Sequence, residues 1–282
     1  NNVVSCIVED NKHNLWIGTS DGGLNYYDNA SQLYKNYLFN SGNLDVPFKD
    51  IKTVYVDEVQ DRIYVGAHAG GMMVLHRKSG YIEYYNRHNS NLPSNNIYSI
   101  ISDGYGGLWV ASLEYLLHFD IDKRNFTIVD VDEDGHKLQQ YNRLLFCDSK
   151  KRIWAGGEMG ISVFNQVGTS LLPNTDFQIA SVLKQAFVNC FYETSSGYLW
   201  IGTRNGLFAL KESDKQFLQY TTENGLPSNV IYGILEDAYG RLWISTNQGL
   251  SCLNPESGKF RNFTIMDGLQ GNQFNAGAYC RK

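Results

Sequence analysis

Leu15-Trp16-Ile17-Gly18-Thr19 is the first of six short phrases in which an aromatic residue stands between apolar neighbours and small residues follow. The other five are Ile63-Tyr64-Val65-Gly66-Ala67, Leu108-Trp109-Val110-Ala111-Ser112, Ile153-Trp154-Ala155-Gly156-Gly157, Leu199-Trp200-Ile201-Gly202-Thr203 and Leu242-Trp243-Ile244-Ser245-Thr246. The aromatic positions are separated by 48, 45, 45, 46 and 43 residues. A repeat of about 40–50 residues built from short strands is typical of a β-propeller blade. The phrases therefore predict an all-β propeller with one phrase in each blade.

The third repeat shows how a blade is organised. Its apolar runs at 97–101, 108–112, 116–120 and 125–129 alternate with polar turns, and helical periodicity is absent. Such a pattern predicts four short antiparallel strands. The blades are expected at 1–46, 47–93, 94–137, 138–184, 185–226 and 227–265, and residues 266–282 either start a seventh blade or close the ring.

Positions that recur from blade to blade are assigned to the scaffold. An aspartate stands six residues before the aromatic in four repeats, as Asp10, Asp103, Asp148 and Asp237. Its carboxylate can accept N–H groups of the turn that follows. We expect the tryptophans to pack between blades, and glycines two positions after the aromatic to let neighbouring sheets approach closely.

Composition excludes several function classes. The 282 residues carry a formal charge of −5, which argues against a general affinity for nucleic acid. The chain contains no run of 18 apolar residues, which is the length that could span a membrane. The five cysteines are scattered without a Cys-x-x-Cys pair, so buried free thiols are expected and the compartment stays open.

No cofactor or metal is expected. The chain contains no His-Glu-x-x-His, no Gly-x-Ser-x-Gly and no P-loop. Residues 130–135 match the first half of a calcium loop, but the twelfth position would be Tyr141 where such a loop has Glu. A solvated acidic turn is the better interpretation of this segment.

The candidate site consists of positions that do not repeat. In a propeller, the loops from the second to the third strand and the links between blades share one face. The candidate ligand-binding residues on it are His68, Glu114, Tyr115, Tyr141, Arg143, Glu158, Arg204, Asn205 and Gln248. The links also place Phe48, Asn95 and Asn229 there. Forked donors and acceptors match vicinal hydroxyls and aromatic rings stack on sugars, so this rim favours a polyhydroxylated ligand.

Two links between blades carry a more specific pattern. Residues 92–100 read Leu-Pro-Ser-Asn-Asn-Ile-Tyr-Ser-Ile, and residues 225–234 read Gly-Leu-Pro-Ser-Asn-Val-Ile-Tyr-Gly-Ile. With the phrase Gly-x-Leu-Trp-Ile-Gly-Thr-x-x-Gly-Leu at 197–207, they resemble the regulator-propeller repeats of bacterial hybrid two-component systems, especially those of gut Bacteroidetes. The third repeat departs from the phrase, with Ala111 for glycine and Glu114 and Tyr115 in the glycine turn. Residues 268–275 are similar to the segment that opens the last blade in this family.

The resemblance implies a periplasmic sensor domain of an inner-membrane receptor. Such a domain would bind an oligosaccharide or other glycan breakdown product, relay it to a histidine kinase and act within a homodimer. It implies no enzymatic activity in this segment, no nucleic-acid partner and no membrane contact. In this family two seven-bladed propellers precede the kinase, so the chain would be most of the second one.

Two other functions stay open. The propeller could be a protein-interaction scaffold, which would bind a protein and no glycan. It could also be a polysaccharide lyase or glycosidase, in which Glu114, Glu158, His68 and Arg143 are the credible acid and base groups.

Overall fold

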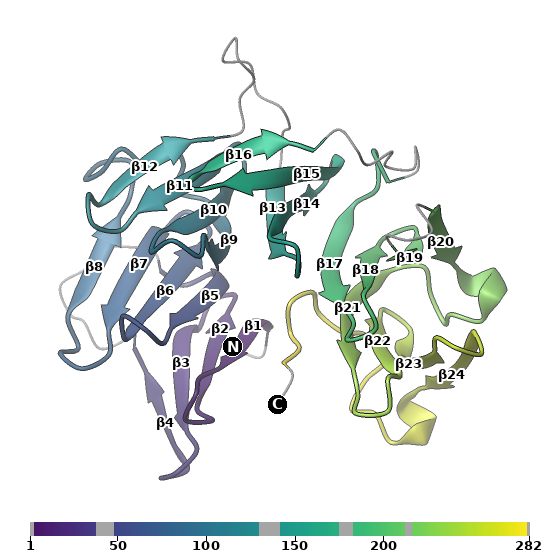
Figure 1. The fold of residues 1–282 in the computed structure, drawn as a ribbon. Helices are drawn as coiled ribbons and strands as arrows, with labels where there is room; N and C mark the ends of the chain where they lie inside the picture. The colour runs from purple at the N-terminus through teal and green to yellow at the C-terminus, as the bar shows by residue number, and fades with distance from the viewer. Residues whose placement is uncertain (1–2, 38–47, 130–141, 175–182, 212–215, 281–282) are drawn as a thin grey trace.

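The computed structural model describes residues 3–37, 48–129, 142–174, 183–211 and 216–280. These residues form six sheets of four antiparallel strands arranged in a ring (Figure 1). The predicted all-β propeller is therefore confirmed. Both Tyr141 and the acidic segment 130–135 lie outside the described residues.

Each sheet is one blade, and its strands pair in chain order. Blades 1 to 3 contain β1 (Val4–Glu9), β2 (Leu15–Thr19), β3 (Gly23–Asp28), β4 (Leu33–Asn36), β5 (Ile51–Asp57), β6 (Arg62–Ala67), β7 (Gly71–His76), β8 (Ile82–Tyr85), β9 (Ile97–Ser102), β10 (Leu108–Ser112), β11 (Leu116–Asp120) and β12 (Asn125–Ile128). Blades 4 to 6 contain β13 (Asn142–Cys147), β14 (Arg152–Gly157), β15 (Gly160–Val167), β16 (Ser170–Pro173), β17 (Val188–Glu193), β18 (Tyr198–Thr203), β19 (Gly206–Lys211), β20 (Gln216–Tyr220), β21 (Ile231–Glu236), β22 (Leu242–Thr246), β23 (Gly249–Asn254) and β24 (Lys259–Phe263).

The described helices are two short 3-10 turns, η1 (Thr222–Asn224) and η2 (Ile265–Asp267). Neither approaches the length or hydropathy that a membrane-crossing helix needs, and no other helix occurs in the part of the chain that the structure describes.

The recurring aspartate anchors the first turn of a blade, as predicted. In blade 4, one oxygen of Asp148 accepts the backbone N–H groups of Lys150 and Arg152 at 3.0 and 2.9 Å. The other oxygen accepts the indole N–H of Trp154 at 2.8 Å. Asp10 and Asp237 bind their turns and tryptophans in the same way. The carboxylate thus ties the turn to the buried aromatic of the second strand.

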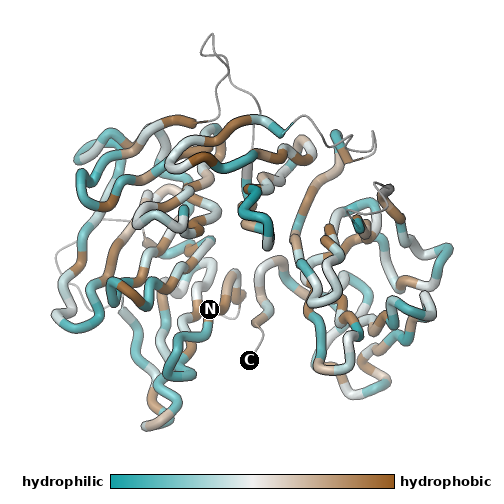
Figure 2. Tube along the Cα trace, in the orientation of Figure 1, coloured by the Kyte–Doolittle hydropathy of each residue, from teal (hydrophilic) through white to brown (hydrophobic). Residues whose placement is uncertain are grey.

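The core lies between neighbouring blades. Trp16, Trp109, Trp154 and Trp200 are almost fully buried, which confirms the predicted inter-blade role, whereas Trp243 in the last blade is only partly buried. A methyl group on Gly18 would come within 2.6 Å of Ile51 in the next blade, so this packing requires glycine. Along the chain, apolar stretches alternate with polar turns (Figure 2).

A β-bulge interrupts the innermost strand of every blade at the same place. In blade 5, for example, Val188 pairs with Thr203 and Cys190 with Gly202, so Asn189 is the extra residue. A bulge leaves the extra residue outside the ladder and re-aims its side chain. The six bulge residues are Ser5, Lys52, Tyr98, Arg143, Asn189 and Tyr232. This position is therefore constant in geometry and variable in chemistry.

The links between blades are held by asparagines. The carboxamide oxygen of Asn95 accepts the N–H of Arg87, and its carbonyl accepts the N–H of Gly71. Asn229 makes the same pair of bonds to the N–H groups of Thr222 and Gly206. Both residues were predicted to belong to the recognition rim, and the structure gives them turn-forming hydrogen bonds. Phe48, predicted there too, is buried in the core of blades 1 and 2.

The C-terminal segment begins like such a link. Asn272 accepts the N–H groups of Ile265 and Gly249, which repeats the pattern of Asn95 and Asn229. Beyond it, residues 273–280 form no strand and lie between blades 6 and 1 (Figure 1). Tyr279 packs on the core of blades 5 and 6, and Gly277 lies against the carbonyl of Ser5 in blade 1. The segment therefore bridges the two ends of the ring.

Candidate functional site

Two arginines and two aromatic rings lie in a row across blades 3, 4 and 5. Arg143, the bulge residue of β13, has its guanidinium carbon 5.0 Å from the ring centre of Tyr98 and 5.9 Å from that of Phe187. The guanidinium carbon of Arg204 in turn lies 3.7 Å from the centre of the same Phe187 ring. We call Tyr98, Arg143, Phe187 and Arg204 the axial cluster. Its members come from two bulges, one inter-blade link and one loop, which all lie at the same end of the blades.

A carboxylate partly neutralises the axial cluster. Glu158, in the turn between β14 and β15, forms an ion pair with Arg143. The Nε atom of Arg143 is buried and has no hydrogen-bond partner among the described residues. The ion pair therefore leaves one guanidinium donor unused.

Blade 2 extends the axial cluster on its other side. The ring centre of His68 lies 6.4 Å from that of Tyr98, and its Nδ1 lies 3.9 Å from a carboxylate oxygen of Asp50. Lys52, the bulge residue of β5, pairs with the other oxygen of Asp50 at 2.8 Å. Three positive side chains and two carboxylates thus lie around the cluster when His68 is neutral.

Arg204 carries the unbalanced charge. It is exposed, and within the described ranges no carboxylate pairs with it. A guanidinium stacked on a ring keeps its in-plane N–H donors free for a ligand. Burial raises the pKa of Tyr98, and the charge of Arg143 opposes this rise, so the phenol stays protonated and can donate at neutral pH.

Chemically, the axial cluster suits recognition of oxygen-rich ligands. Aromatic faces stack on apolar faces of sugar rings, and guanidinium forks donate to hydroxyls, carboxylates or sulfates. No group of three or more His, Cys, Asp or Glu residues could hold a metal ion in the described segments.

The structure brings four of the nine predicted residues together, namely His68, Arg143, Glu158 and Arg204. Of the other five, Tyr141 lies outside the described residues and four are not part of this group. Tyr115 packs on the core of blades 2 and 3, next to the exposed Glu114. Asn205 and Gln248 are exposed on the loops of blades 5 and 6.

Sequence reasoning missed Tyr98 and Phe187. Tyr98 lies inside the strand predicted at 97–101 and is not among the candidate residues. A signal existed, because the bulge position reads Ser, Lys, Tyr, Arg, Asn and Tyr in the six repeats while its neighbours, Asn142 excepted, are apolar or small. Phe187 had no comparable signal.

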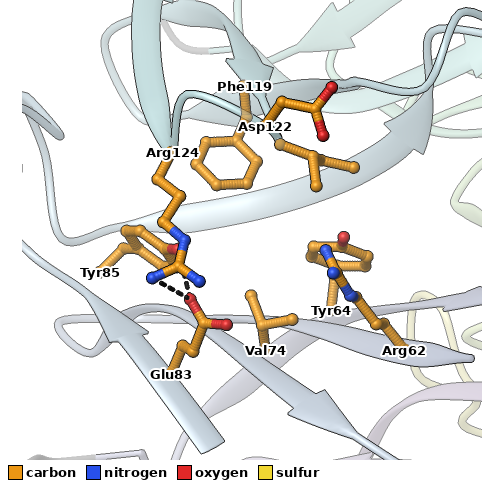
Figure 3. A pocket seen from close by; sticks show the side chains of 9 residues that line it. Arg62, Tyr64, Val74, Glu83, Tyr85, Phe119, Asp122 and Arg124 are labelled. Atoms are coloured by element: carbon orange, nitrogen blue, oxygen red, sulfur yellow. Dashed lines mark hydrogen bonds and ion pairs between the residues drawn. The ribbon is translucent and has the colours of Figure 1, made fainter. Parts of the chain in front are cut away.

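The opposite end of the blades also has cavities. Figure 3 shows one of about 170 Å³ between blades 2 and 3, with Arg62 and Tyr64 on one wall and Arg124 on the other. Arg124 lies 3.7 Å from Glu83, and the hydroxyl of Tyr85 donates to the same carboxylate at 2.7 Å. Glu83, Tyr85 and Arg124 therefore bind one another, whereas the hydroxyl of Tyr64 has no hydrogen-bond partner among the described residues.

Comparison with known proteins finds similarity to two-component signalling proteins. The sequence model of the family "Two component regulator propeller" matches residues 1–21, 91–114, 183–205 and 225–248. The chain is 25% identical over 253 residues to "Histidine kinase P4" of Formosa agariphila, and the match covers 84% of this chain and 18% of that protein. The chain therefore spans less than a fifth of that relative.

Solved structures share the fold. The chain is similar to the extracellular domains of two putative hybrid two component systems from B. thetaiotaomicron, with TM-scores of 0.73 and 0.75. Sequence identities are 21% and 20%, and the matches cover 97% and 96% of this chain and 36% and 34% of those domains.

Proposed function

We propose, on the premise that this chain belongs to the two component regulator propeller family, that it is the ligand-recognising part of an extracytoplasmic sensor. In a cell with an outer membrane the domain would lie in the periplasm, as part of an inner-membrane receptor. The ligand would be an oligosaccharide released from a glycan, and the domain itself would be non-enzymatic.

The axial cluster is the observation that carries this proposal. Its aromatic rings and guanidinium groups come from three successive blades, so one extended ligand can contact all of them. The exposed Arg204 and the unused donor of Arg143 favour a ligand that carries an acidic sugar.

The signal would pass to a histidine kinase elsewhere in the full-length receptor. A ligand shifts an equilibrium only through its different affinity for two states. Binding at the axial cluster would therefore favour one arrangement of the propellers in a receptor homodimer over another.

Substitution of Arg204 tests the proposal. Purified domain would be screened by calorimetry against neutral and uronic-acid-containing oligosaccharides, and the best binder would be titrated into Arg204→Ala. We expect at least about tenfold weaker binding, since a charge-assisted hydrogen bond contributes about 1.5–3 kcal/mol. The melting temperature should stay unchanged, because Arg204 is exposed and its contact is a surface stack.

Arg261→Ala is the matched control, because Arg261 also stacks on a phenylalanine, Phe263, at 4.8 Å in blade 6. It should bind the oligosaccharide as the unchanged chain does. Equal loss of binding and melting temperature in Arg204→Ala would make Arg204 a structural residue. New reducing ends or unsaturated products after incubation with the oligosaccharides would replace the sensor with an enzyme.

A further inference from the structure

A cavity of about 410 Å³ opens between blades 5 and 6, at the end of the blades opposite the axial cluster. Its volume falls in the range of about 300–1,000 Å³ that is usual for small-molecule sites. Its walls include Ser195, Tyr198, Trp200, Tyr220, Glu236 and Tyr239. The Tyr198 and Tyr220 rings lie 6.2 and 5.8 Å from Trp200, so aromatic surface dominates one side.

The indole N–H of Trp200 has no hydrogen-bond partner among the described residues, although Trp200 is 2% exposed. In the four other blades that have a tryptophan, the equivalent N–H is satisfied. Trp154 and Trp243 donate to Asp148 and Asp237 at 2.8 and 3.0 Å, and Trp109 donates to a glutamine. A buried donor without a partner costs free energy and calls for an explanation.

Two substitutions within the repeat explain the free donor. In blades 4 and 6 an aspartate stands six residues before the tryptophan and pairs with an arginine that stands two residues before it. Blade 5 has Thr194 and Tyr198 at these two positions. The Thr194 hydroxyl binds the N–H and carbonyl of Tyr198 and does not reach the indole. No carboxylate therefore stands beside the indole of Trp200, and Tyr198 lines the cavity at the position that holds an arginine in blades 4 and 6.

We propose that this inter-blade cavity is a binding site for a neutral sugar ring whose oxygen accepts the indole N–H of Trp200. The aromatic rings offer stacking surface for the apolar face of a pyranose. Ser196 and Asn254, also on the wall, offer further polar groups for its hydroxyls.

Charge excludes an anionic ligand. The charged residues that line the cavity are Glu236 and Glu256, and no Lys, Arg or His among the described residues lines it. Both oxygens of Glu236 accept bonds from Ser195, at 3.0 Å each, so this carboxylate shapes the wall. A cationic ligand fits the carboxylates but would leave the indole donor unpaired. A neutral hydroxylated ring satisfies both conditions.

The site is tested by following the five indole N–H signals in ¹⁵N-tryptophan-labelled protein, with Trp200→Phe identifying the signal of Trp200. Glucose, galactose, N-acetylglucosamine and cellobiose would be titrated separately. We expect at least one sugar to move the Trp200 signal in a saturable way. No movement with any of the four, or movement with choline in their place, would overturn the proposal.

Thr194→Asp provides the decisive variant, because it restores the carboxylate of the other blades. It should keep the bond to Tyr198, pair the indole, raise the melting temperature and weaken sugar binding at least tenfold. Thr194→Ser, which leaves the indole free, should bind as the unchanged chain does. Tyr239→Ala removes a highly exposed wall and should weaken binding without loss of fold. Unchanged affinity in both Thr194→Asp and Tyr239→Ala would refute the site.

This proposal does not depend on the proposed function of the axial cluster. Arg204→Ala should leave the response of Trp200 to sugars intact. If oligosaccharide binding depends on Arg204 but no sugar moves the Trp200 signal, the inter-blade cavity is not a site. If a sugar moves the Trp200 signal but Arg204→Ala changes no binding, the axial cluster is not one.

Discussion

Removal of the carboxylate of Asp148 should destabilise the propeller far more than removal of the equivalent carboxylate in blade 6. In blade 4, Asp148 is almost fully buried, and Arg152 is 14% exposed. Asp148→Ala deprives two backbone N–H groups, the indole of Trp154 and the guanidinium of Arg152 of one acceptor.

The magnitude follows from which of these donors water can reach. Lys150 lies on an exposed turn, so its backbone N–H can be rehydrated. The indole of Trp154 is fully buried, and loss of its bond to Asp148 costs about 1–3 kcal/mol. Breaking a buried ion pair typically costs about 3–5 kcal/mol, and partial exposure of Arg152 lowers this figure. We expect the free energy of unfolding to fall by about 3 kcal/mol.

Urea unfolding, followed by tryptophan fluorescence, measures the fall in the free energy of unfolding. The slope of this free energy against urea concentration should stay unchanged. Asp237→Ala is the matched control, since Asp237 and Arg241 make the same bonds with 20% and 43% exposure. Its unfolding midpoint should shift much less. Equal shifts in the two variants would show that burial of the turn does not set the strength of the motif, and the reasoning would fail.

Two further outcomes test the packing. Gly202→Ala should destabilise the domain by about 1–3 kcal/mol, because the added methyl group would collide with Cys190 and come within 2.7 Å of Ile231; Gly271→Ala, with nothing within 4 Å of the added atom, should leave the melting temperature unchanged. Cys190 should resist iodoacetamide at about pH 8 in the folded protein, because burial raises the pKa of its thiol to about 12. Mass spectrometry showing rapid modification of Cys190 without unfolding would contradict its placement in the core.

Repetition explains why the fold could be predicted from the sequence. The aromatic phrase recurs six times, and the aspartate before it and the glycine after it each recur in four repeats. The structure confirms the scaffold roles of Asp148 and Gly18. The candidate sites were harder to predict from the sequence. The absence of aspartate at position 194 is visible in the sequence, but the cavity beside Trp200 depends on the distance between two sheets.

Residues in equivalent loops also diverge in ways that sequence does not separate. Asn95 and Arg143 both lie near the ends of blades, and both are polar and predicted to recognise a ligand. Asn95 spends its hydrogen bonds on the backbone of the link, whereas Arg143 meets side chains of the neighbouring blades. The partners of a side chain, and not its type, decide between scaffold and site.

The bulge shows how one backbone position can serve both purposes. In blades 1 and 5 the bulge residue binds the next blade, since Ser5 donates to the carbonyl of Ile51 and Asn189 donates to that of Ile231 at 2.8 Å. In blades 3 and 4 the same position carries Tyr98 and Arg143 of the axial cluster. A bulge is set by backbone register, so its side chain can change without altering the pairing around it. The side chain at the bulge can therefore change while its backbone position stays fixed. Packing between blades relies instead on the glycines and tryptophans that repeat.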